Sequence, residues 1–332
     1  MDLMKRRWSR GLLFTSAFLC LISVFFYTDE SLYRIFILPL MLYALYNSYL
    51  ELVVAKIFIS PNNSKPSIEG GIWDSHLPQF KSLRSHILTT NVNGENAPIV
   101  IFIHGWRSTS LSVVDRAEWF IEKGWNAVII ELIGHGKSSH IDRWNAISAV
   151  EHVEHHLNHL DTFIDISHSP ELFVYGHSMG GFIASRISST NSKVNKLQWT
   201  GTILESPLMM YSEIYDEIAN TLLVPNILRK PLLRRVYREV LQMHPEVQVE
   251  DTLEQFNIPK WGLPRAPTLC LQASNDNRLG RIHYDALHQH AEHSRTTFHL
   301  IETLSHSGAK RNAERENLLL NWLSEFDSLL LK

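Results

Sequence analysis

The sequence predicts an α/β fold built on an open, doubly wound and mostly parallel sheet. Six short apolar runs follow residue 80, and each run is continuous rather than alternating, which is typical of strands buried on both faces of a sheet. Segments with helical periodicity lie between these runs, and strand–helix alternation of this kind predicts parallel strands joined by helices. Because ligands of such folds bind at the carboxyl ends of the strands, we expect the functional groups at that edge.

The first sixty residues precede this pattern and differ from it. A basic cluster comes before residues 11–27, a run of 17 residues without a charge, and a second apolar stretch covers residues 35–55. The cluster consists of Lys5, Arg6, Arg7 and Arg10. No small-residue cleavage site follows the first run, so we expect residues 1–58 to form a retained membrane anchor rather than a cleaved signal peptide. A two-helix hairpin, which we favour, would leave the rest of the chain on the cytoplasmic side, and a single span would place it outside.

The remaining chain divides by composition and pattern. Residues 59–79 are expected to be a linker, because proline, glycine, asparagine and serine dominate their first part. Residues 80–207 and 265–332 carry the strand–helix alternation and are expected to form the two parts of one sheet domain. Residues 208–264 fall between two expected strands and are rich in helix-forming residues without a strand pattern. We therefore expect this segment to be a helical cap over the site.

The elements of the sheet domain follow from the same periodicities. The expected strands are residues 99–103, 127–130, 172–175, 202–204, 268–271 and 298–301. The expected helices are residues 111–123, 147–164, 179–189, 281–293 and 311–330. In the second of these helices, apolar residues recur at steps of three and four and give one apolar stripe.

Composition excludes several classes of function. The net charge of −3 argues against a nucleic-acid partner, because phosphate binding needs a concentrated basic face. The two cysteines, Cys20 and Cys270, allow neither a disulfide framework nor a paired-cysteine metal site. Seven histidines crowd two of the expected helices but lack the spacing of known zinc motifs, and we interpret them as solvated faces. They are His152, His155, His156, His159, His288, His290 and His293. We expect no metal and no organic cofactor.

The strongest chemical signal is Gly176-His177-Ser178-Met179-Gly180, which follows an expected strand and opens an expected helix. A sharp turn between strand and helix holds the serine in a strained conformation, and Gly176 and Gly180 leave room for the close approach of the chain. The hydroxyl group then projects at the top of the sheet beside the positive end of the helix. We therefore expect Ser178 to be a nucleophile.

A serine hydroxyl needs a base, and the base needs an acid that orients it. His306 follows the last expected strand, in Leu-Ser-His-Ser, and is the candidate base. Asp276 follows the expected strand 268–271 and is the candidate acid. Glu205 also ends a strand and is the alternative acid.

The transition state of acyl transfer needs hydrogen-bond donors for an oxyanion. One donor should be the backbone N–H of Met179, the residue after the nucleophile. The second should be the N–H of Trp106, in the His104-Gly105-Trp106 turn that follows strand 99–103. The glycine before Trp106 lets the backbone turn sharply into the site. We expect His104, like His177, to pack or to hold loops.

These motifs together resemble the α/β-hydrolase superfamily over residues 95–325. The resemblance lies in His-Gly-Trp at 104–106, Gly-His-Gly-Lys-Ser at 134–138, Gly-His-Ser-Met-Gly-Gly at 176–181, and the later Asp276 and His306. Within the superfamily the chain is similar to the monoacylglycerol lipase and lysophospholipase-like branch. The resemblance implies an α/β-hydrolase fold with a helical cap and an acyl-serine mechanism, but the motifs say little about the substrate.

The sequence therefore predicts a membrane-anchored serine hydrolase that cleaves carboxylic esters, with a lipidic ester such as a monoacylglycerol or lysophospholipid as the expected partner. An acyl-thioesterase or a small-molecule carboxylesterase is the alternative enzyme, and a catalytically silent binding protein at the membrane is the alternative of another class. In the cap, basic residues alternate with apolar ones over residues 228–240. This pattern fits either an amphipathic helix with a solvated basic side or a surface that rests on anionic lipid.

Overall fold

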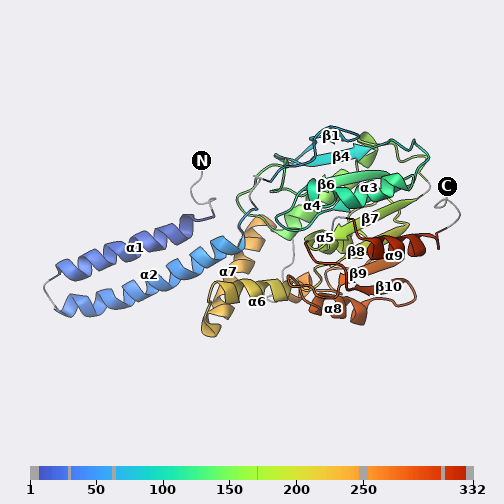
Figure 1. Ribbon diagram of the computed structural model, residues 1–332. Coiled ribbons are helices and arrows are strands. Elements are labelled where there is room, and N and C mark those ends of the chain that lie inside the picture. Colours follow the sequence, from blue (N-terminus) through green and yellow to red (C-terminus); the bar gives the residue numbers. More distant parts are fainter. Residues whose placement is uncertain are drawn as a thin grey trace. The chain divides into compact units, whose positions relative to one another are not determined.

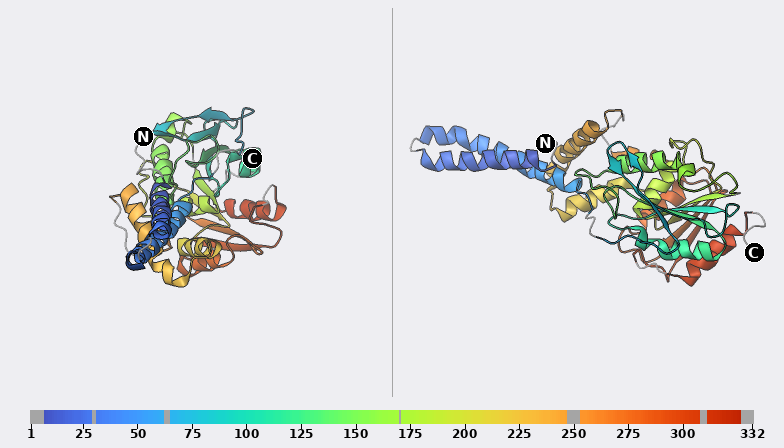
Figure 2. Two further views of the ribbon diagram at one scale, coloured as in Figure 1. Left: turned by 90° about the vertical axis from the view of Figure 1, so that its left-hand side faces the viewer. Right: turned by 90° about the horizontal axis from the view of Figure 1, so that it is seen from above.

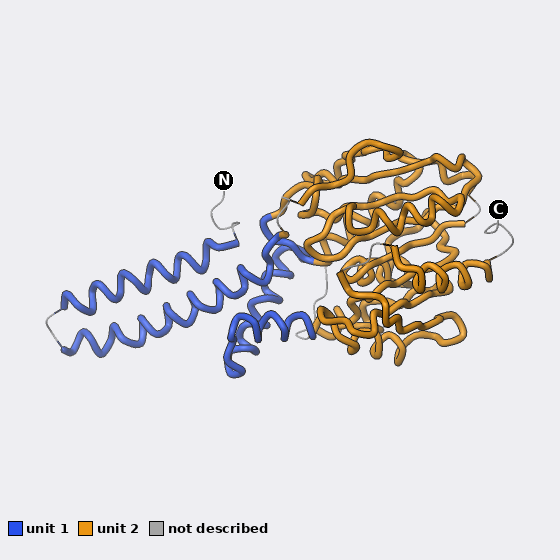
Figure 3. Tube along the Cα trace, in the orientation of Figure 1, with its two compact units in different colours: residues 1–60, 142–145, 213–252 blue, residues 61–141, 146–212, 253–332 orange. Residues whose placement is uncertain are grey.

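The computed structural model describes residues 7–28, 31–61, 65–169, 171–246, 253–307 and 311–326. The chain divides into two compact units, which are coloured separately in Figure 3. The smaller unit consists of residues 1–60, 142–145 and 213–252, and the larger unit contains the rest.

The larger unit is built on an eight-stranded sheet with the strand order β1-β4-β6-β5-β7-β8-β9-β10 (Figure 1). Its strands are β1 Asp74–His76, β4 His86–Thr90, β5 Ile99–Ile103, β6 Asn126–Glu131, β7 Leu172–His177, β8 Gly201–Glu205, β9 Thr268–Ala273 and β10 Thr296–Ile301. The strands from β6 to β10 are all parallel, whereas β4 runs antiparallel to β6 and β1 runs antiparallel to β4. The expected mostly parallel sheet is confirmed, and all six expected strands are present in it.

The sequence did not predict β1, β4 or the small hairpin of β2 (Gln79–Phe80) and β3 (Leu83–Arg84). Strand β4 has the sequence His-Ile-Leu-Thr-Thr, and all five of its residues are buried. The largest polar side chain of this strand is buried with a partner, because His86 Nδ1 lies 2.8 Å from Glu131 Oε2 on the neighbouring strand. An apolar run was therefore not needed to place this strand in the core.

Helices cover both faces of the sheet. They are α3 Val114–Glu122, α4 Ala146–Leu157, α5 Met179–Ile187, α8 Ile282–His290 and α9 Ala313–Leu323. Residues of α3 and α9 share one apolar cluster with Phe102, Phe173 and Tyr175 of the central strands. Helix α5 contacts β5, β7 and β8 from outside this cluster, together with α4. The helix expected at 147–164 ends at Leu157, and only a 3-10 turn, Leu160–Thr162, follows it. The apolar periodicity continued because Leu160 is buried, although the helix does not continue.

Part of the expected linker 59–79 belongs to the sheet domain. Ile68 and Trp73 are both buried in the main apolar cluster, and strand β1 begins at Asp74. The backbone N–H of Ile68 donates a 2.9 Å hydrogen bond to Ser110 Oγ. These contacts fix the second half of the segment against the core, so its composition was a poor guide to its structure.

The smaller unit contains the helices α1 Ser9–Tyr27, α2 Ser31–Ile57 and α7 Asn226–Met243, and most of α6 Tyr211–Thr221. Helices α1 and α2 lie side by side as an antiparallel hairpin (Figure 2). Thr15 Oγ1 lies 2.7 Å from Ser48 Oγ, and a side chain at Gly11 would collide with Leu52. Both helices are long and apolar enough to cross a membrane.

Most apolar side chains of this hairpin point outward. Those with large exposed areas include Leu12, Leu13, Leu19, Phe26, Leu32, Ile35, Phe36, Leu40, Leu42 and Tyr43. The buried residues of α2 are confined to its second half, from Ala44 to Ala55, and include Glu51. In that half α2 contacts α7. The first half of α2 and nearly all of α1 therefore present an apolar surface with no covering element among the described residues.

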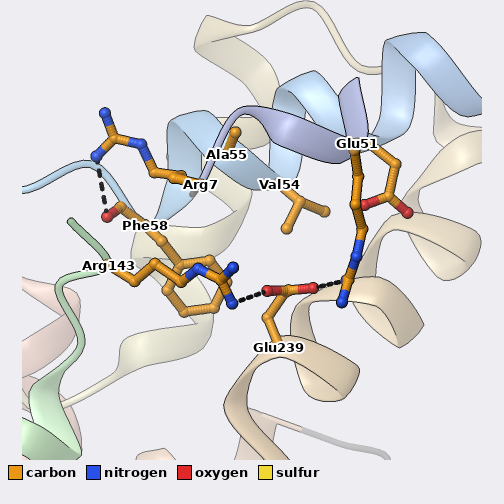
Figure 4. Close-up of a pocket in the computed structure, with 8 residues that line it drawn as sticks. Arg7, Glu51, Val54, Ala55, Phe58, Arg143 and Glu239 are labelled. Atoms are coloured by element: carbon orange, nitrogen blue, oxygen red, sulfur yellow. Dashed lines mark hydrogen bonds and ion pairs between the residues drawn. The ribbon is translucent and has the colours of Figure 1, made fainter. Parts of the chain in front are cut away.

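Ion pairs fasten α7 to the hairpin. Glu51 of α2 accepts hydrogen bonds from Arg235 and Arg238 of α7, at 3.2 and 2.5 Å. Glu239 of α7 pairs in turn with Arg10 of α1 and, at 2.8 Å, with Arg143 (Figure 4). The interpretation of the basic residues of 228–240 as a uniformly solvated or lipid-facing side is therefore wrong for Arg235, whose guanidinium group is engaged by α2.

Candidate active site

Ser178 occupies the turn between β7 and α5, with φ 55° and ψ −118°. A positive φ is unfavourable for a residue with a side chain, so the neighbouring structure must hold it. The Ser178 N–H donates a 3.0 Å hydrogen bond to the backbone carbonyl of Glu205 on β8. The Ser178 carbonyl accepts from the N–H groups of Gly181 and Leu208, at 2.9 and 3.0 Å. The strained turn is thus fixed on both sides by backbone hydrogen bonds.

The glycines around this turn are required by space. A Cβ atom at Gly176 would lie 2.5 Å from the carbonyl oxygen of Gly180, and one at Gly180 would lie 1.9 Å from the carbonyl oxygen of Ile103. Real Cβ contacts are not this short, so no other residue fits without moving the backbone. A Cβ at Gly105 would also lie 3.1 Å from Cβ of Ser178. The turn therefore packs directly against the end of β5.

The structure brings Ser178, His306 and Asp276 together in one chain of hydrogen bonds. His306 Nε2 lies 3.0 Å from Ser178 Oγ, and His306 Nδ1 lies 2.8 Å from Asp276 Oδ2. A carboxylate accepts only, so Nδ1 carries a proton and donates it to Asp276. In the neutral ring Nε2 is then the acceptor for the Ser178 hydroxyl group, which is the arrangement that a general base needs.

The carboxylate of Asp276 is held in its ionised form. Its Oδ1 accepts hydrogen bonds of 2.9 Å from the backbone N–H groups of Arg278 and Leu279, and its Oδ2 accepts one of 3.0 Å from Gln272 Nε2. Burial opposes ionisation, but the hydrogen bonds from His306, Leu279 and Arg278 outweigh it and lower the pKa of Asp276 to about 2. The sequence did not single out Gln272, which reads as an ordinary residue of strand β9.

Glu205, the alternative acid, has other partners. Its carboxylate accepts hydrogen bonds from Arg116, from Arg315 and from the Tyr175 hydroxyl group, all of them buried. Burial would raise its pKa, but Arg116 and Arg315 lower it well below the ordinary value. Among the described residues it makes no hydrogen bond to His306. The geometry therefore favours Asp276 as the orienting acid and makes Glu205 the centre of a core ion cluster.

His177, next to the nucleophile, holds the backbone of the candidate base. Its Nε2 donates to the carbonyl oxygen of His306 over 2.8 Å, and its Nδ1 is buried without a partner. Burial lowers the pKa of His177 to about 3, so the ring is neutral at physiological pH. His104 is buried as well, and its Nε2 accepts a 3.1 Å hydrogen bond from the N–H of Leu132.

The expected oxyanion donors lie in the two turns that follow β7 and β5. Met179 is the first residue of α5, and Trp106 follows Gly105 in the turn after β5. The next residue, Arg107, has a positive φ of 55°, and its N–H donates to His135 Nε2 over 3.1 Å. This contact fixes the turn in which Trp106 lies. The roles of the Met179 and Trp106 N–H groups stay predictions.

The histidine-rich helix α4 is not a uniformly solvated face, and that interpretation is wrong for His152 and His156. Both are buried, with 4% and 1% of their surface exposed. Phe80 of the small β2–β3 hairpin covers this side of α4 and stacks on His155 at a ring distance of 4.0 Å. Burial lowers the pKa of His152 to about 4 and that of His156 to about 3. The sequence did not predict the β2–β3 hairpin, so the burial of histidine rings beneath it was not expected.

Comparisons with known proteins agree with this fold. A model of the family described as serine aminopeptidase, S33, matches residues 94–255. An esterase from Pyrococcus furiosus is 14% identical with a TM-score of 0.59, and the match covers 81% of this chain and 97% of that one. A putative hydrolase from Agrobacterium vitis S4 is 16% identical with a TM-score of 0.56, covering 78% and 99%.

One further structure matches almost the whole chain. It is a membrane phospholipase A described as a bacterial virulence factor, 17% identical with a TM-score of 0.50, and the match covers 95% of this chain and 98% of that one. At these identities the likeness shows the fold. No curated protein matches the sequence.

Proposed function

We propose that this chain, which has an α/β-hydrolase fold, is a serine esterase that hydrolyses lipidic carboxylic esters at a membrane. The observation that carries the catalytic part is the continuous hydrogen-bonded chain from Ser178 Oγ through His306 to Asp276. Each of the three side chains lies at the carboxyl end of a parallel strand or in the loop that follows it. Nothing in the packing of the fold alone needs this set of residues.

The reaction follows from this geometry. As Ser178 Oγ attacks the ester carbonyl carbon, its proton passes to His306 Nε2, and the negative charge of the tetrahedral intermediate falls on the former carbonyl oxygen. The N–H groups of Met179 and Trp106 stabilise that oxyanion. His306 returns the proton to the departing alcohol oxygen, which leaves an acyl group on Ser178. A water molecule, deprotonated by His306, then releases the carboxylic acid and restores the serine.

The exposed hairpin supports the membrane part of the proposal. Helix α1 has 19 residues, so it is roughly 28 Å long, close to the thickness of a bilayer core. Soluble proteins rarely expose a continuous apolar surface of this size. An inserted hairpin would return the chain to the side of its N-terminus, and the basic cluster before α1 favours the cytoplasm for that side. The similarity to a membrane phospholipase A, which extends over the anchor region, supports the same interpretation.

Membrane anchoring favours a lipid substrate over a water-soluble one. A lipid ester partitions into the bilayer, so an enzyme held there meets it at a high effective concentration. A water-soluble ester gains nothing from tethering. We therefore assign the substrate to the class of monoacylglycerols and lysophospholipids.

The experiment uses the full chain in proteoliposomes. A fluorophosphonate probe should label the wild type and not Ser178→Ala, whereas Ser188→Ala, which alters a buried serine just after α5, should label normally. Turnover is then compared for monoacylglycerol, lysophospholipid, a short p-nitrophenyl ester, an acyl thioester and an aminoacyl anilide. Faster turnover of the two lipids is expected. Absence of labelling in the folded wild type would contradict the enzyme proposal, and preference for the thioester or anilide would contradict the lipid assignment.

A further inference from the structure

One face of α7 is exposed along its whole length. It consists of Ile227, Lys230, Arg234, Arg238 and Leu241, which follow one another at steps of three and four residues. Residues with this spacing lie on one side of a helix, and we name this set the α7 stripe. Within the part of the chain that the structure describes, Lys230 and Arg234 form no hydrogen bond or ion pair. The stripe is therefore basic in the middle and apolar at both ends.

The turn between α6 and α7 places a leucine where a helix normally ends with glycine. The Leu223 N–H donates to the carbonyl of Asn220 over 2.9 Å, and the Val224 N–H donates to that of Ala219 over 2.8 Å. This pattern closes α6 with a residue in the left-handed conformation, a position that favours glycine. Leu223 occupies it, with φ 53° and 84% of its surface exposed. Four residues later Ile227 is also 84% exposed. An exposed leucine in this strained position does not stabilise the fold, which makes its side chain a candidate for contact with a partner.

The contacts of α7 with the hairpin show where the stripe lies relative to that interface. Successive residues of a helix are rotated by about 100° round its axis. The side chains of α7 are therefore arranged round the axis in the order Glu239, Arg235, Arg238 and then the rest of the stripe. Glu239 pairs with Arg10, at the end of the hairpin where α1 begins. Arg235 lies 5.3 Å from the ring of Tyr46, beside the exposed apolar half of α2. Arg238, the next residue in this order, pairs with Glu51 in the second half of α2. The stripe therefore begins at the edge of the contact with the hairpin and continues round α7 away from it.

We propose that α7 is a second membrane contact, which lies in the headgroup layer of an anionic bilayer beside the base of the hairpin. Leu223 and Ile227 insert at the boundary with the acyl chains, and Lys230 and Arg234 contact lipid phosphates. Basic amphipathic helices bind anionic bilayers in this way. The partner is the anionic lipid surface, because two unpaired cations flanked by apolar side chains complement it, and because α7 is ion-paired to a hairpin that presents an exposed apolar surface of its own.

The proposal rests on insertion of the hairpin, which belongs to the proposed function, and it assigns the basic residues differently from the sequence. Arg235 is occupied by Glu51 and by Asn47, whose Oδ1 lies 2.8 Å from a guanidinium nitrogen. Replacing Arg235 would therefore loosen α7 from the hairpin instead of testing lipid contact. Lys230 and Arg234 are the residues whose removal leaves the unit intact.

The test measures depth in the bilayer with an environment-sensitive fluorophore on single cysteines. Full-length protein with Cys20→Ser and Cys270→Ala carries the label through Leu223→Cys, or through Leu19→Cys in the middle of α1. The protein is reconstituted in nanodiscs of phosphatidylcholine with or without phosphatidylglycerol, and lipids with quenchers on the acyl chain report proximity. The label at position 223 should be quenched, and more strongly with phosphatidylglycerol. The label at position 19 should be quenched in both lipid mixtures.

The second part of the test removes the two basic side chains of the α7 stripe and repeats the quenching measurement. Lys230→Gln/Arg234→Gln should lower the ratio of quenched to unquenched label at position 223 by roughly 25-fold, since each basic residue contributes a factor of about five near an anionic surface. Lys123→Gln/Lys196→Gln, which removes the same charge from exposed sites of the larger unit, should leave the ratio unchanged. In addition, Leu223→Gly should not destabilise the fold, because glycine suits the left-handed position.

The outcomes separate the two proposals. A quenched label at position 19 with a water-like label at position 223 would overturn the α7 contact and leave the hairpin in place. A water-like label at both positions would overturn hairpin insertion itself. Equal quenching at position 223 by neutral and anionic bilayers, unchanged by the double Gln variant, would overturn the assignment of Lys230 and Arg234 to lipid phosphates.

Discussion

His177 Nε2 donates a hydrogen bond of 2.8 Å to the backbone carbonyl of His306, so the residue before the nucleophile holds the backbone of the candidate base. A hydrogen bond of this kind contributes about 1 kcal/mol. We expect His177→Phe to lower kcat by roughly three- to tenfold through misplacement of the His306 ring. His177→Gln retains a donor and should recover part of the loss. A purely structural role would instead lower the amount of folded enzyme and leave kcat per labelled active site unchanged.

The acid can be identified by comparing two substitutions. Asp276→Asn should lower kcat by about 10⁴-fold, because His306 would lose the acceptor that fixes its tautomer and stabilises its charged form. Glu205→Gln should affect kcat far less. It should lower the free energy of unfolding instead, by roughly 3 kcal/mol, because Arg116 and Arg315 would be left buried and poorly paired. Steady-state kinetics and urea unfolding measure the two effects, and the reverse pattern would assign the acid to Glu205.

Stability should fall steeply in mild acid because of the buried histidines of α4. Burial lowers the pKa of His152 to about 4 and that of His156 to about 3, whereas both should titrate near 6.5 in the unfolded chain. Below about pH 6.5 the unfolded chain therefore binds more protons. Each histidine then removes about 1.4 kcal/mol of stability per pH unit, until the pH reaches its folded pKa.

The pH dependence can be measured by urea unfolding in detergent between pH 7 and pH 4.5. His156→Phe should make the slope of stability against pH shallower by about 1.4 kcal/mol per unit. The exposed His290→Asn should not change the slope. An unchanged slope in His156→Phe would mean that this ring is accessible to protons in the folded state.

Glu51 should be the residue that holds α7 on the hairpin. It is 5% exposed and accepts hydrogen bonds from Arg235 and Arg238. We expect Glu51→Gln to increase trypsin cleavage within residues 226–243 several-fold, because both arginines lose their charged partner. Glu217→Gln, on the exposed side of α6, is the matched control. Equal protection in both variants would show that packing alone holds α7.

The same contacts affect the design of truncations. Removing residues 1–58 deletes Glu51, the shared partner of Arg235 and Arg238, together with Arg10, one of the two partners of Glu239. A truncated chain should therefore show the proteolysis pattern of Glu51→Gln in addition to any loss of membrane binding. Substitutions in the α7 stripe separate lipid contact from the integrity of the unit.

The features that could be predicted from the sequence are those with local signals. Strand β5 is a run of five apolar residues, and the turn at Ser178 needs two glycines at fixed distances from the serine. Both depend on residues close together in the chain. The order of nucleophile, acid and base follows from the fold that these motifs indicate, so Asp276 and His306 could be named as candidates.

The features that were missed depend on distant partners. Arg235 bonds to Glu51, which is 184 residues away, and nothing in the amphipathic pattern of α7 indicates that partner. The buried polar strand β4 is stable in the core because His86 reaches Glu131 on β6. The choice between Asp276 and Glu205 likewise depends on Arg116 and Arg315, since both acids end a strand of the same sheet.

The most direct measurement of the central claim is mass spectrometry of the acyl-enzyme. Full-length protein in vesicles is mixed with a monoacylglycerol or lysophospholipid of known chain length and quenched with acid within the first turnover. The account predicts a peptide carrying Ser178 that is heavier by the mass of that acyl group, and no such peptide from Ser178→Ala. Turnover of the lipid without an adduct on Ser178, or with the acyl group on another residue, would contradict it.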